Sequence, residues 1–302
     1  MKKKSILIVD DEPLLRKIVS DYLKKTYAVE VASSGDEAVA ILKKRHFDLV
    51  ISDIIMPGID GFEVANIVRQ EYPKTKIALL TAYDIDKYLE VARDKMVTNI
   101  IAKESPFNFD DLGHTVHNLL TGDFFGLQRY LDPDASIDSF LIQDTHKIQS
   151  SITQILNFCR RKCPDPEILE ICDLIIDELL NNAIIHAPRF SNGQPKYKKA
   201  KRVVSEDSEV VRCDYGYDNK KIGVAVSDNF GSLENKTVMD ILHRHISKAG
   251  FKDNRGRGLF ISRSLTDRFI INIERKVRTE IIFLIYFKEH SRKTKPLCIY
   301  EI

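Results

Sequence analysis

Residues 175–187 read IIDELLNNAIIHA, and the polar residues in this stretch are spaced as on one face of a helix. Glu178, Asn182 and His186 recur every four residues, whereas apolar neighbours such as Leu174 can turn towards a core. The row of acid, amide and imidazole is either the solvated stripe of an amphipathic helix or part of a binding site. Motifs on both sides of the stretch favour the binding site.

The composition is that of an ordinary soluble globular protein. The chain has 302 residues, enough for about two domains, with 43% apolar and 30% charged residues. Residues 1–122 hold 17 Lys and Arg against 19 Asp and Glu, and the remainder holds 29 against 25. The resulting charges of −2 and +4 are too small to indicate nucleic-acid binding.

Targeting signals and cysteine pairs give no sign of an extracellular protein. The apolar run after the basic first residues is too short for a secretory signal, and none approaches the roughly 20 residues of a membrane helix. The five cysteines are odd in number and lack the paired spacing of a metal site, so we interpret them as reduced thiols. We therefore expect a cytoplasmic protein.

The first half alternates strands and helices. Apolar runs rich in β-branched residues occupy residues 5–9, 28–32, 49–52, 76–80 and 98–102. Helical patterns lie between them, at about residues 13–24, 36–45, 61–71, 84–95 and 109–120. Strict alternation predicts a doubly wound parallel sheet with helices on both faces.

Polar residues stand where four of these strands end. Asp10 and Asp11 follow the first strand, Asp53 the third, Thr81 the fourth and Lys103 the fifth. Chemistry in open parallel sheets collects at the carboxyl ends of the strands. Three converging carboxylates predict a Mg²⁺ site, beside which one carboxylate can attack a phosphoryl group that a hydroxyl and an ammonium bind.

These residues, with Met56-Pro57-Gly58 and Asp60-Gly61, resemble the receiver domain of two-component response regulators over residues 4–121. The resemblance implies a flavodoxin-like fold, phosphorylation by an upstream histidine kinase, and Asp53 as the phospho-acceptor. It further implies that Asp10, Asp11, Asp53 and the Ile55 carbonyl hold Mg²⁺ while Thr81 and Lys103 bind the phosphoryl group.

Two positions depart from the receiver pattern. Ile100 stands where receivers usually have an aromatic switch residue, and Glu104 stands where a proline usually follows the lysine. The phosphorylation chemistry should survive both changes. The route by which phosphorylation is sensed is therefore open.

The second half begins after a predicted boundary near residue 122. We expect residues 1–122 to form the receiver domain, residues 123–138 a structured connection, and residues 139–302 a second domain. A helix is predicted over residues 140–161, and its His146 is either a phospho-acceptor or, as the following residues favour, a solvated helix histidine. The basic loop at residues 188–208 is either a solvated insertion or a partner or lid contact.

Two later segments have the composition of a nucleotide site. Predicted strands at residues 210–217 and 221–227 lead to Asp228, where a buried carboxylate could accept the exocyclic amine of adenine. After a helix at about residues 234–247, the sequence Arg255-Gly256-Arg257-Gly258 opens another helix, and glycine-rich helix starts bind phosphates through their amides. Strands at residues 269–275 and 280–287 close the chain.

Together these motifs resemble the ATPase module shared by histidine kinases, gyrase and Hsp90-type chaperones, an α+β Bergerat-type sandwich. Residues 140–288 look most like the anti-sigma-factor serine kinases within that group. The resemblance implies Glu178 as general base, Asn182 as a Mg²⁺ ligand, and a cofactor-binding set comprising Asn182, His186, Asp228, Gly231, Arg255, Gly256, Arg257, Gly258 and Thr279. Phe230 and Ser232 replace glycines usual in the aspartate loop, which puts nucleotide affinity in question.

The leading hypothesis is a response regulator whose Asp53 phosphorylation controls an ATP-dependent protein serine/threonine kinase. By analogy its substrate is an anti-sigma-factor antagonist, a sigma factor is a possible partner, and homodimerisation is possible. One alternative is a degenerate ATPase-like domain that serves as a phosphorylation-gated binding platform, as Phe230 would favour. Another is a histidine kinase acting in trans.

Overall fold

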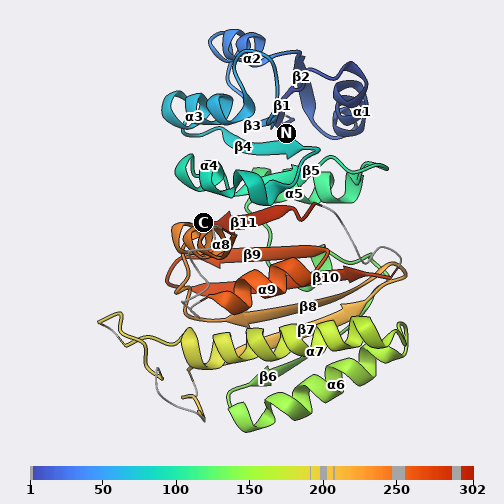
Figure 1. Cartoon of the computed structure of the whole chain (residues 1–302), viewed down its shortest axis with the longest axis vertical. Helices are drawn as coiled ribbons and strands as arrows, with labels where there is room; N and C mark the ends of the chain where they lie inside the picture. Colours follow the sequence, from blue (N-terminus) through green and yellow to red (C-terminus); the bar gives the residue numbers. More distant parts are fainter. Residues whose placement is uncertain (1–2, 191, 198–202, 207, 247–255, 288–293) are drawn as a thin grey trace. The chain divides into compact units, whose positions relative to one another are not determined.

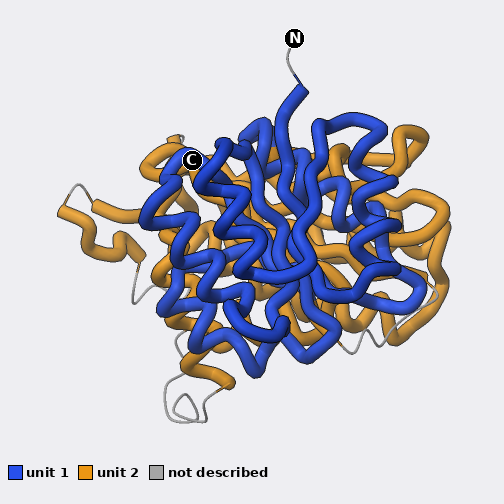
Figure 2. Tube along the Cα trace, turned by 90° about the horizontal axis from the view of Figure 1, so that it is seen from above, with its two compact units in different colours: residues 1–123, 296–298 blue, residues 124–295, 299–302 orange. Residues whose placement is uncertain are grey.

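The computed structural model describes residues 3–190, 192–197, 203–206, 208–246, 256–287 and 294–302. The chain divides into two compact units, which Figure 2 colours separately. Unit 1 comprises residues 1–123 and 296–298, and unit 2 comprises residues 124–295 and 299–302. The sequence predicted that residues 139–302 form one domain. In the structure, residues 296–298 instead belong to unit 1.

Unit 1 contains a five-stranded parallel sheet in the order β2-β1-β3-β4-β5 (Figure 1). Its strands are β1 (Ser5–Val9), β2 (Ala28–Ala32), β3 (Leu49–Asp53), β4 (Lys76–Thr81) and β5 (Asn99–Ala102). Leu297 and Cys298, from β11 (Leu297–Glu301), pair antiparallel with β5. The helices are α1 (Pro13–Lys24), α2 (Gly35–Leu42), α3 (Gly61–Glu71), η1 (Ile85–Tyr88), α4 (Leu89–Asp94) and α5 (Phe109–Thr121).

Helices cover both faces of this sheet, because alternate residues of each strand point to opposite sides. Ile6 and Ile8 of β1 join a core with α1 and α5, whereas Leu7 and Val9 join a second core with α2 and α3. The predicted doubly wound, flavodoxin-like fold is confirmed for this half. Both faces of β1, β3 and β5 are buried, which explains why these strands read as continuous apolar runs.

Polar caps set the helix boundaries. Ser34, Asp60 and Asn108 each accept a hydrogen bond from a backbone N–H in the first turn of α2, α3 and α5. At the other end of α5, Gly122 adopts a left-handed conformation with φ +71°. That conformation favours glycine and stops the helix at the predicted junction.

Unit 2 contains an antiparallel sheet in the order β9-β10-β8-β7-β6. Its strands are β6 (Ser136–Ile142), β7 (Val211–Tyr217), β8 (Lys221–Asp228), β9 (Arg268–Glu274) and β10 (Arg278–Tyr286). Its helices are η2 (Leu127–Arg129), η3 (Thr145–Lys147), α6 (Ile148–Arg160), α7 (Pro166–Asn181), η4 (Asn182–His186), α8 (Asn235–Ile246) and α9 (Arg257–Leu265). In Figure 1, α6, α7 and α9 lie over one face of this sheet.

The two faces of the sheet carry different elements. Tyr215 of β7 contacts Phe158 of α6, so Tyr215 and its β8 partner Val224 point to the helical face. Asp228 lies four residues further along β8 and points the same way. Gly223 faces the other side, against Leu127 of η2, so residues after the junction pack on the face opposite the helices.

The predicted helix over residues 140–161 is wrong in its first part. Residues 136–142 form β6, which pairs with β7 along its whole length, and Asp144 caps the η3 turn before α6 begins at Ile148. The apolar residues at helical spacing start only at Ile148, so Phe140 and Leu141 belong to the strand. β11 was not predicted either.

The helix predicted around Glu178, Asn182 and His186 forms, but its last turn is wider than that of an α-helix. α7 passes into a π-helical turn at Asn182–His186, where the Ala187 N–H donates to the Asn182 carbonyl. Leu174 was expected to face the core, yet it is 54% exposed. None of the helices in the described ranges is long and apolar enough to cross a membrane.

Candidate functional site

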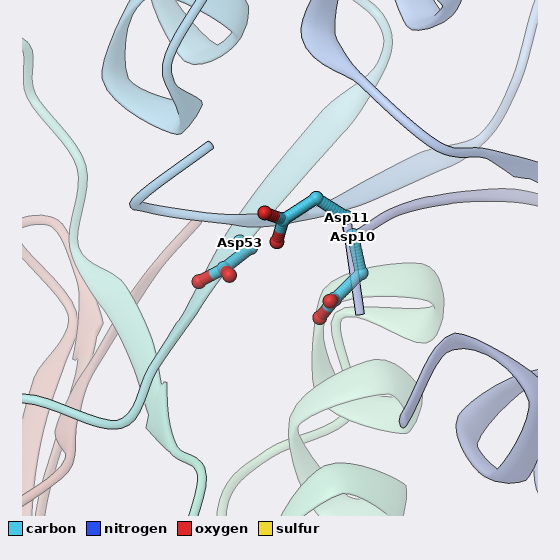
Figure 3. A group of neighbouring side chains, drawn as sticks. All are labelled: Asp10, Asp11 and Asp53. Atoms are coloured by element: carbon cyan, nitrogen blue, oxygen red, sulfur yellow. The ribbon is translucent and has the colours of Figure 1, made fainter. Parts of the chain in front are cut away.

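The polar strand ends of unit 1 form one cluster. Asp10 follows β1, Asp53 ends β3, and Asp11 lies on the surface beside them (Figure 3). One carboxylate oxygen from each of the three lies within 4.8 Å of the other two. Asp10 and Asp53 are 1% and 7% exposed, so two negative charges stand in a nearly dry environment.

Lys103 joins the two buried carboxylates. Its ammonium Nζ lies 2.8 Å from Asp10 Oδ2 and 2.6 Å from Asp53 Oδ2. Burial raises the pKa of Asp53, and the bond to Lys103 only partly opposes this effect. Burial by itself lowers the pKa of Lys103, but its bonds to Asp10 and Asp53 raise it on balance, so the lysine remains charged.

The other residues of this cluster lie at the same edge of the sheet. Thr81 is buried at the end of β4, and its Oγ1 accepts a 3.0 Å hydrogen bond from the Tyr83 N–H, which leaves the hydroxyl hydrogen able to donate. Gly61 opens α3 against the strand end: a Cβ there would lie 2.0 Å from the Asp53 carbonyl oxygen. The Ile55 N–H donates a hydrogen bond to the Asp53 carboxylate.

The carboxylates of Asp10, Asp11 and Asp53 form a set of oxygen ligands that Mg²⁺ fits. Hard divalent cations prefer carboxylate and carbonyl oxygens, and a cation would offset the charge that Lys103 alone does not balance. The structure places Asp10, Asp11, Asp53, Thr81 and Lys103 at one edge of the sheet. The peptide bond between Ser105 and Pro106, after Lys103, is cis.

Unit 2 holds the predicted nucleotide residues in two groups. In the first, Asn182 Nδ2 donates a 2.8 Å hydrogen bond to Glu178 Oε1, and both side chains are partly buried. Gly258 of α9 lies against the same carboxylate, since a Cβ there would be 1.7 Å from Glu178 Oε1. His186 is exposed at the last position of the π-helical turn.

The second group lies at the sheet. Asp228 and Thr279 are directly paired in the β8–β10 ladder and are both buried. Asp228 accepts a 2.9 Å hydrogen bond from the Phe230 N–H, and nearby backbone N–H groups favour its charged form, but its burial raises its pKa to about 6. Thr279 Oγ1 is buried and lacks a hydrogen-bond partner among the residues that the structure describes.

Glycines shape the surroundings of both groups. Gly231 has φ +54°, and a Cβ there would meet the backbone of Glu274 and Lys276. Gly256 precedes α9 with φ +75° and packs on the Ile241 side chain. Arg257 is exposed at the first position of α9, and Arg255 lies outside the described residues.

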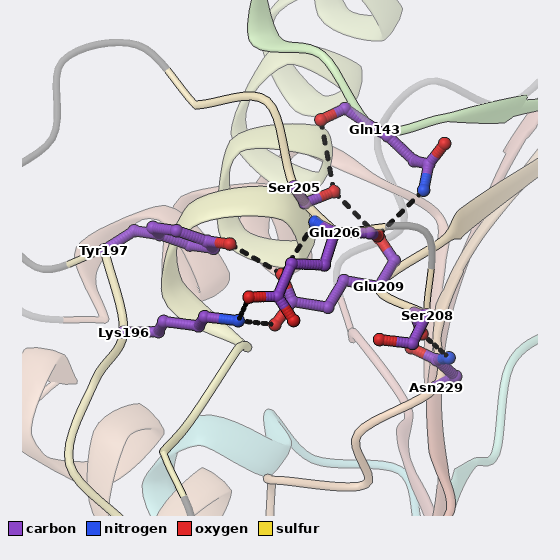
Figure 4. Close-up of polar contacts among 8 residues, drawn as sticks. All are labelled: Gln143, Lys196, Tyr197, Ser205, Glu206, Ser208, Glu209 and Asn229. Carbon is purple, nitrogen blue, oxygen red and sulfur yellow. Dashed lines mark hydrogen bonds and ion pairs between the residues drawn. The ribbon is translucent and has the colours of Figure 1, made fainter.

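A polar cluster joins Lys196 and Tyr197, within the basic loop at residues 188–208, to Glu206 and Glu209 (Figure 4). The carboxylate of Glu209 accepts hydrogen bonds of 2.7 Å from Lys196 Nζ and 2.7 Å from Tyr197 Oη. Asn229, next to Asp228, donates to the Ser208 carbonyl. Lys196 is therefore paired with acids, whereas the basic residues at 198–202 lie outside the described residues.

A buried carboxylate that the sequence did not predict as a functional residue lies on the face of the unit 2 sheet opposite the Asp228–Thr279 pair. Glu280 of β10 is 4% exposed and accepts hydrogen bonds from the Gly126 N–H, Asn272 Nδ2 and Ser227 Oγ. The available signal was a single acid in the apolar run at residues 279–286.

Comparison with known families identifies the first unit. The sequence profile of the response regulator receiver domain matches residues 6–117. Residues 6–117 form a response regulator receiver domain. Receiver domains are phosphorylated by histidine kinases and bind Mg²⁺ at the phosphorylation site, so this receiver works in two-component signalling.

Named proteins are similar to parts of this chain. The transcriptional regulatory protein ResD of Bacillus subtilis is 42% identical over 78 residues, which are 26% of this chain and 32% of ResD. The response regulator protein FleR of Pseudomonas aeruginosa is 36% identical over 90 residues, 29% of this chain and 19% of FleR. A probable transcriptional regulator, ycf29 of Porphyra purpurea, is 27% identical over 60% of this chain and 78% of its own length. The chain thus spans a third or less of the first two relatives.

Proposed function

We propose that Asp53 is the phospho-acceptor of the receiver and that its phosphorylation controls ATP-dependent chemistry in the second unit. The observation that supports the first part is the position of Lys103, 2.6 Å from Asp53 and 2.8 Å from Asp10. A carboxylate oxygen of Asp53 attacks the phosphorus of a phosphohistidine on the upstream kinase, and the bond from phosphorus to the histidine nitrogen breaks. The ammonium of Lys103 and the hydroxyl of Thr81 then bind phosphoryl oxygens.

Asp10, Asp11, Asp53 and the Ile55 carbonyl would hold Mg²⁺ at this site. When bound, the cation neutralises the negative charge that accumulates between the carboxylates and the phosphoryl oxygens. Intact-mass measurement with acetyl phosphate as donor tests this part. Wild type should gain one phosphoryl group, and Asp53→Asn should gain none; equal labelling of both would exclude Asp53 as the acceptor.

For the second unit, we infer an ATP-dependent protein serine/threonine kinase of the anti-sigma-factor type. The supporting observation is the buried Asp228–Thr279 pair, a carboxylate beside an unbonded hydroxyl among the described residues, which matches the donor and acceptor groups of adenine. Glu178 would act as general base, and Asn182 would hold Mg²⁺ between the phosphates. Gly256, Gly258 and Arg257 would face the phosphates from the start of α9.

A protein substrate such as an anti-sigma-factor antagonist, a sigma-factor partner, a homodimer and a cytoplasmic location belong to this proposal. Incubation with ATP, Mg²⁺ and a library of serine- and threonine-containing peptides tests the activity. A serine kinase yields acid-stable phosphate, a histidine kinase acting in trans yields acid-labile phosphate, and a binding platform yields none. Transfer should be lost in Glu178→Gln.

The second candidate function is the phosphorylation-gated binding platform. It is favoured by Phe230, a partly buried residue that lies two positions after Asp228 in the aspartate loop. A platform binds no Mg²⁺-ATP. Replacing Phe230 with glycine separates the two functions further, because only a live nucleotide site should gain affinity.

A further inference from the structure

A buried acid without a role in the proposed chemistry lies on the non-helical face of unit 2. The carboxylate of Glu280 accepts two hydrogen bonds from the Gly126 N–H, 2.9 Å to Oε2 and 3.1 Å to Oε1. Asn272 Nδ2 donates at 2.9 Å, and Ser227 Oγ donates at 3.2 Å. A carboxylate removed from water requires such donors, so these contacts are specific rather than incidental.

The hydrogen bonds from the Gly126 N–H to Glu280 tie the sheet to residues 124–126, which we call the connector. The connector begins one residue after unit 1 ends and is the start of unit 2. Asn272 Nδ2 also donates to the Phe124 carbonyl at 2.7 Å, and the Arg278 guanidinium lies 3.7 Å from the centre of the Phe125 ring. Phe124 is 2% exposed, so the connector is held by packing as well as by polar contacts.

The residues that hold the connector are neighbours of the proposed adenine-binding pair. In the sheet register, Glu280 pairs with Ser227 and Asn272, and Thr279 pairs with Asp228 in the next row. Adjacent strand residues point to opposite faces, so Arg278 and Glu280 face the connector while Thr279 between them faces the helices. The connector is therefore attached to β10 on both sides of Thr279.

We propose that Glu280 is a positioning residue that couples the connector to the Asp228–Thr279 pair, so that a shift of the connector moves the nucleotide site. The strand transmits the shift because Thr279 shares its backbone with Arg278 and Glu280. Gly126 adopts φ +102°, a conformation open to glycine, which lets the chain turn directly beneath the carboxylate. Because α5 of the receiver leads into this segment, phosphorylation would reach the second unit through it. This inference rests on the proposed nucleotide site.

Amide hydrogen exchange of the full chain tests the coupling without nucleotide. The readout is the exchange rate of three amides at the pair: that of Phe230, which donates to the Asp228 carboxylate, that of Gly231 next to it, and that of Thr279, which is paired with Asp228 in the ladder. Glu280→Ala should raise these rates at least about tenfold, and Glu280→Gln, which keeps one acceptor oxygen, should raise them less. Rates unchanged in Glu280→Ala would overturn the proposal.

The matched control is Asp218→Asn. Asp218 is also a buried carboxylate that accepts a backbone hydrogen bond from the segment after the junction, at Asp132, but it lies at the opposite end of β8. A general loss of stability would raise the three rates equally in both variants and would also overturn the proposal. If Glu280→Ala does not fold, Gly126→Ala perturbs the connector without removing the acid, and it should raise the same rates.

Mg²⁺-ATP titration of the same variants separates the two proposals. With a live site, Glu280→Ala should weaken binding about tenfold relative to wild type. If wild type binds no ATP, the nucleotide proposal fails, yet exchange at the three amides still decides the coupling. In wild type, acetyl phosphate should change the exchange rates of both the connector and these three amides. In Glu280→Ala it should change those of the connector alone. An identical response at the three amides of both proteins contradicts the coupling.

Discussion

Replacing Lys103 with methionine should destabilise the receiver far more than the same change at a surface lysine. Lys103 Nζ lies 2.8 Å from Asp10 Oδ2, and Lys4 Nζ lies 2.8 Å from Asp48 Oδ1. The distances are equal but the burial is not: the side chains of Lys103 and Asp10 are 9% and 1% exposed, whereas those of Lys4 and Asp48 are 54% and 34% exposed. The comparison therefore sets a buried lysine that bridges two acids against an exposed lysine that pairs with one.

The magnitudes follow from that burial. Removing one partner of a buried ion pair leaves an uncompensated charge and costs about 3–5 kcal/mol, whereas an exposed pair contributes about 0–1 kcal/mol. Since Asp53 already has a raised pKa, its protonated form favours folding, and this contribution is lost as pH rises through its folded-state pKa. The cost of Lys103→Met should therefore grow as pH rises through the folded-state pKa of Asp53, whereas the cost of Lys4→Met, whose partner Asp48 has a lowered pKa, stays flat over the same rise.

Hydrogen exchange at the β3 amides of the full chain measures both effects, because protection there reports the opening of the receiver sheet. Equal, small losses of protection in the two variants would refute the reasoning. So would a loss in Lys103→Met that does not depend on pH.

Three further substitutions test the second unit. Thr279→Val removes a buried hydroxyl that has no hydrogen-bond partner in the described part of the chain. Thermal unfolding should therefore show unchanged or about 1 kcal/mol higher stability, and calorimetry should show weaker Mg²⁺-ATP binding. Gly258→Ala should gain up to about 1 kcal/mol of helix propensity, but its Cβ should displace the Glu178 carboxylate. Phosphate-release assays should therefore show that ATP turnover falls by about 10²-fold or more in a folded protein. Burial raises the pKa of Asp228 to about 6, so the protonated form that stabilises the fold is lost as pH rises through that value. In denaturant unfolding, the free energy of unfolding of wild type should fall by up to about 3 kcal/mol between pH 4 and pH 7 relative to that of Asp228→Asn.

The receiver could be predicted closely because its signals are local. Each strand is a short apolar run, and each functional residue stands where its strand ends, so parallel topology alone brings Asp10, Asp53 and Lys103 together. The sequence could not show that Lys103 bridges both acids at hydrogen-bond distance. That arrangement depends on how side chains from β1, β3 and β5 fill one buried space.

The second half was less predictable because its decisive contacts are non-local. Phe140 and Leu141 were assigned to a helix, since an edge strand with exposed residues carries a weak alternation. The π-helical turn after Asn181 is set by how the helix end packs, and the role of Glu280 depends on contacts to Gly126, 154 residues away. Spacing along the chain carries no signal for either feature.

The central claim, that the second unit is an ATP-binding output, is tested most directly by Mg²⁺-ATP calorimetry of wild type, Asn182→Ala and Asn181→Ala. Asn182 donates to Glu178 in the proposed site, whereas its neighbour Asn181 donates to the Asp177 carbonyl of its own helix. The account predicts binding in wild type and Asn181→Ala that falls at least about tenfold in Asn182→Ala. A folded wild-type protein that releases no heat with Mg²⁺-ATP, or equal affinity in all three proteins, would contradict it.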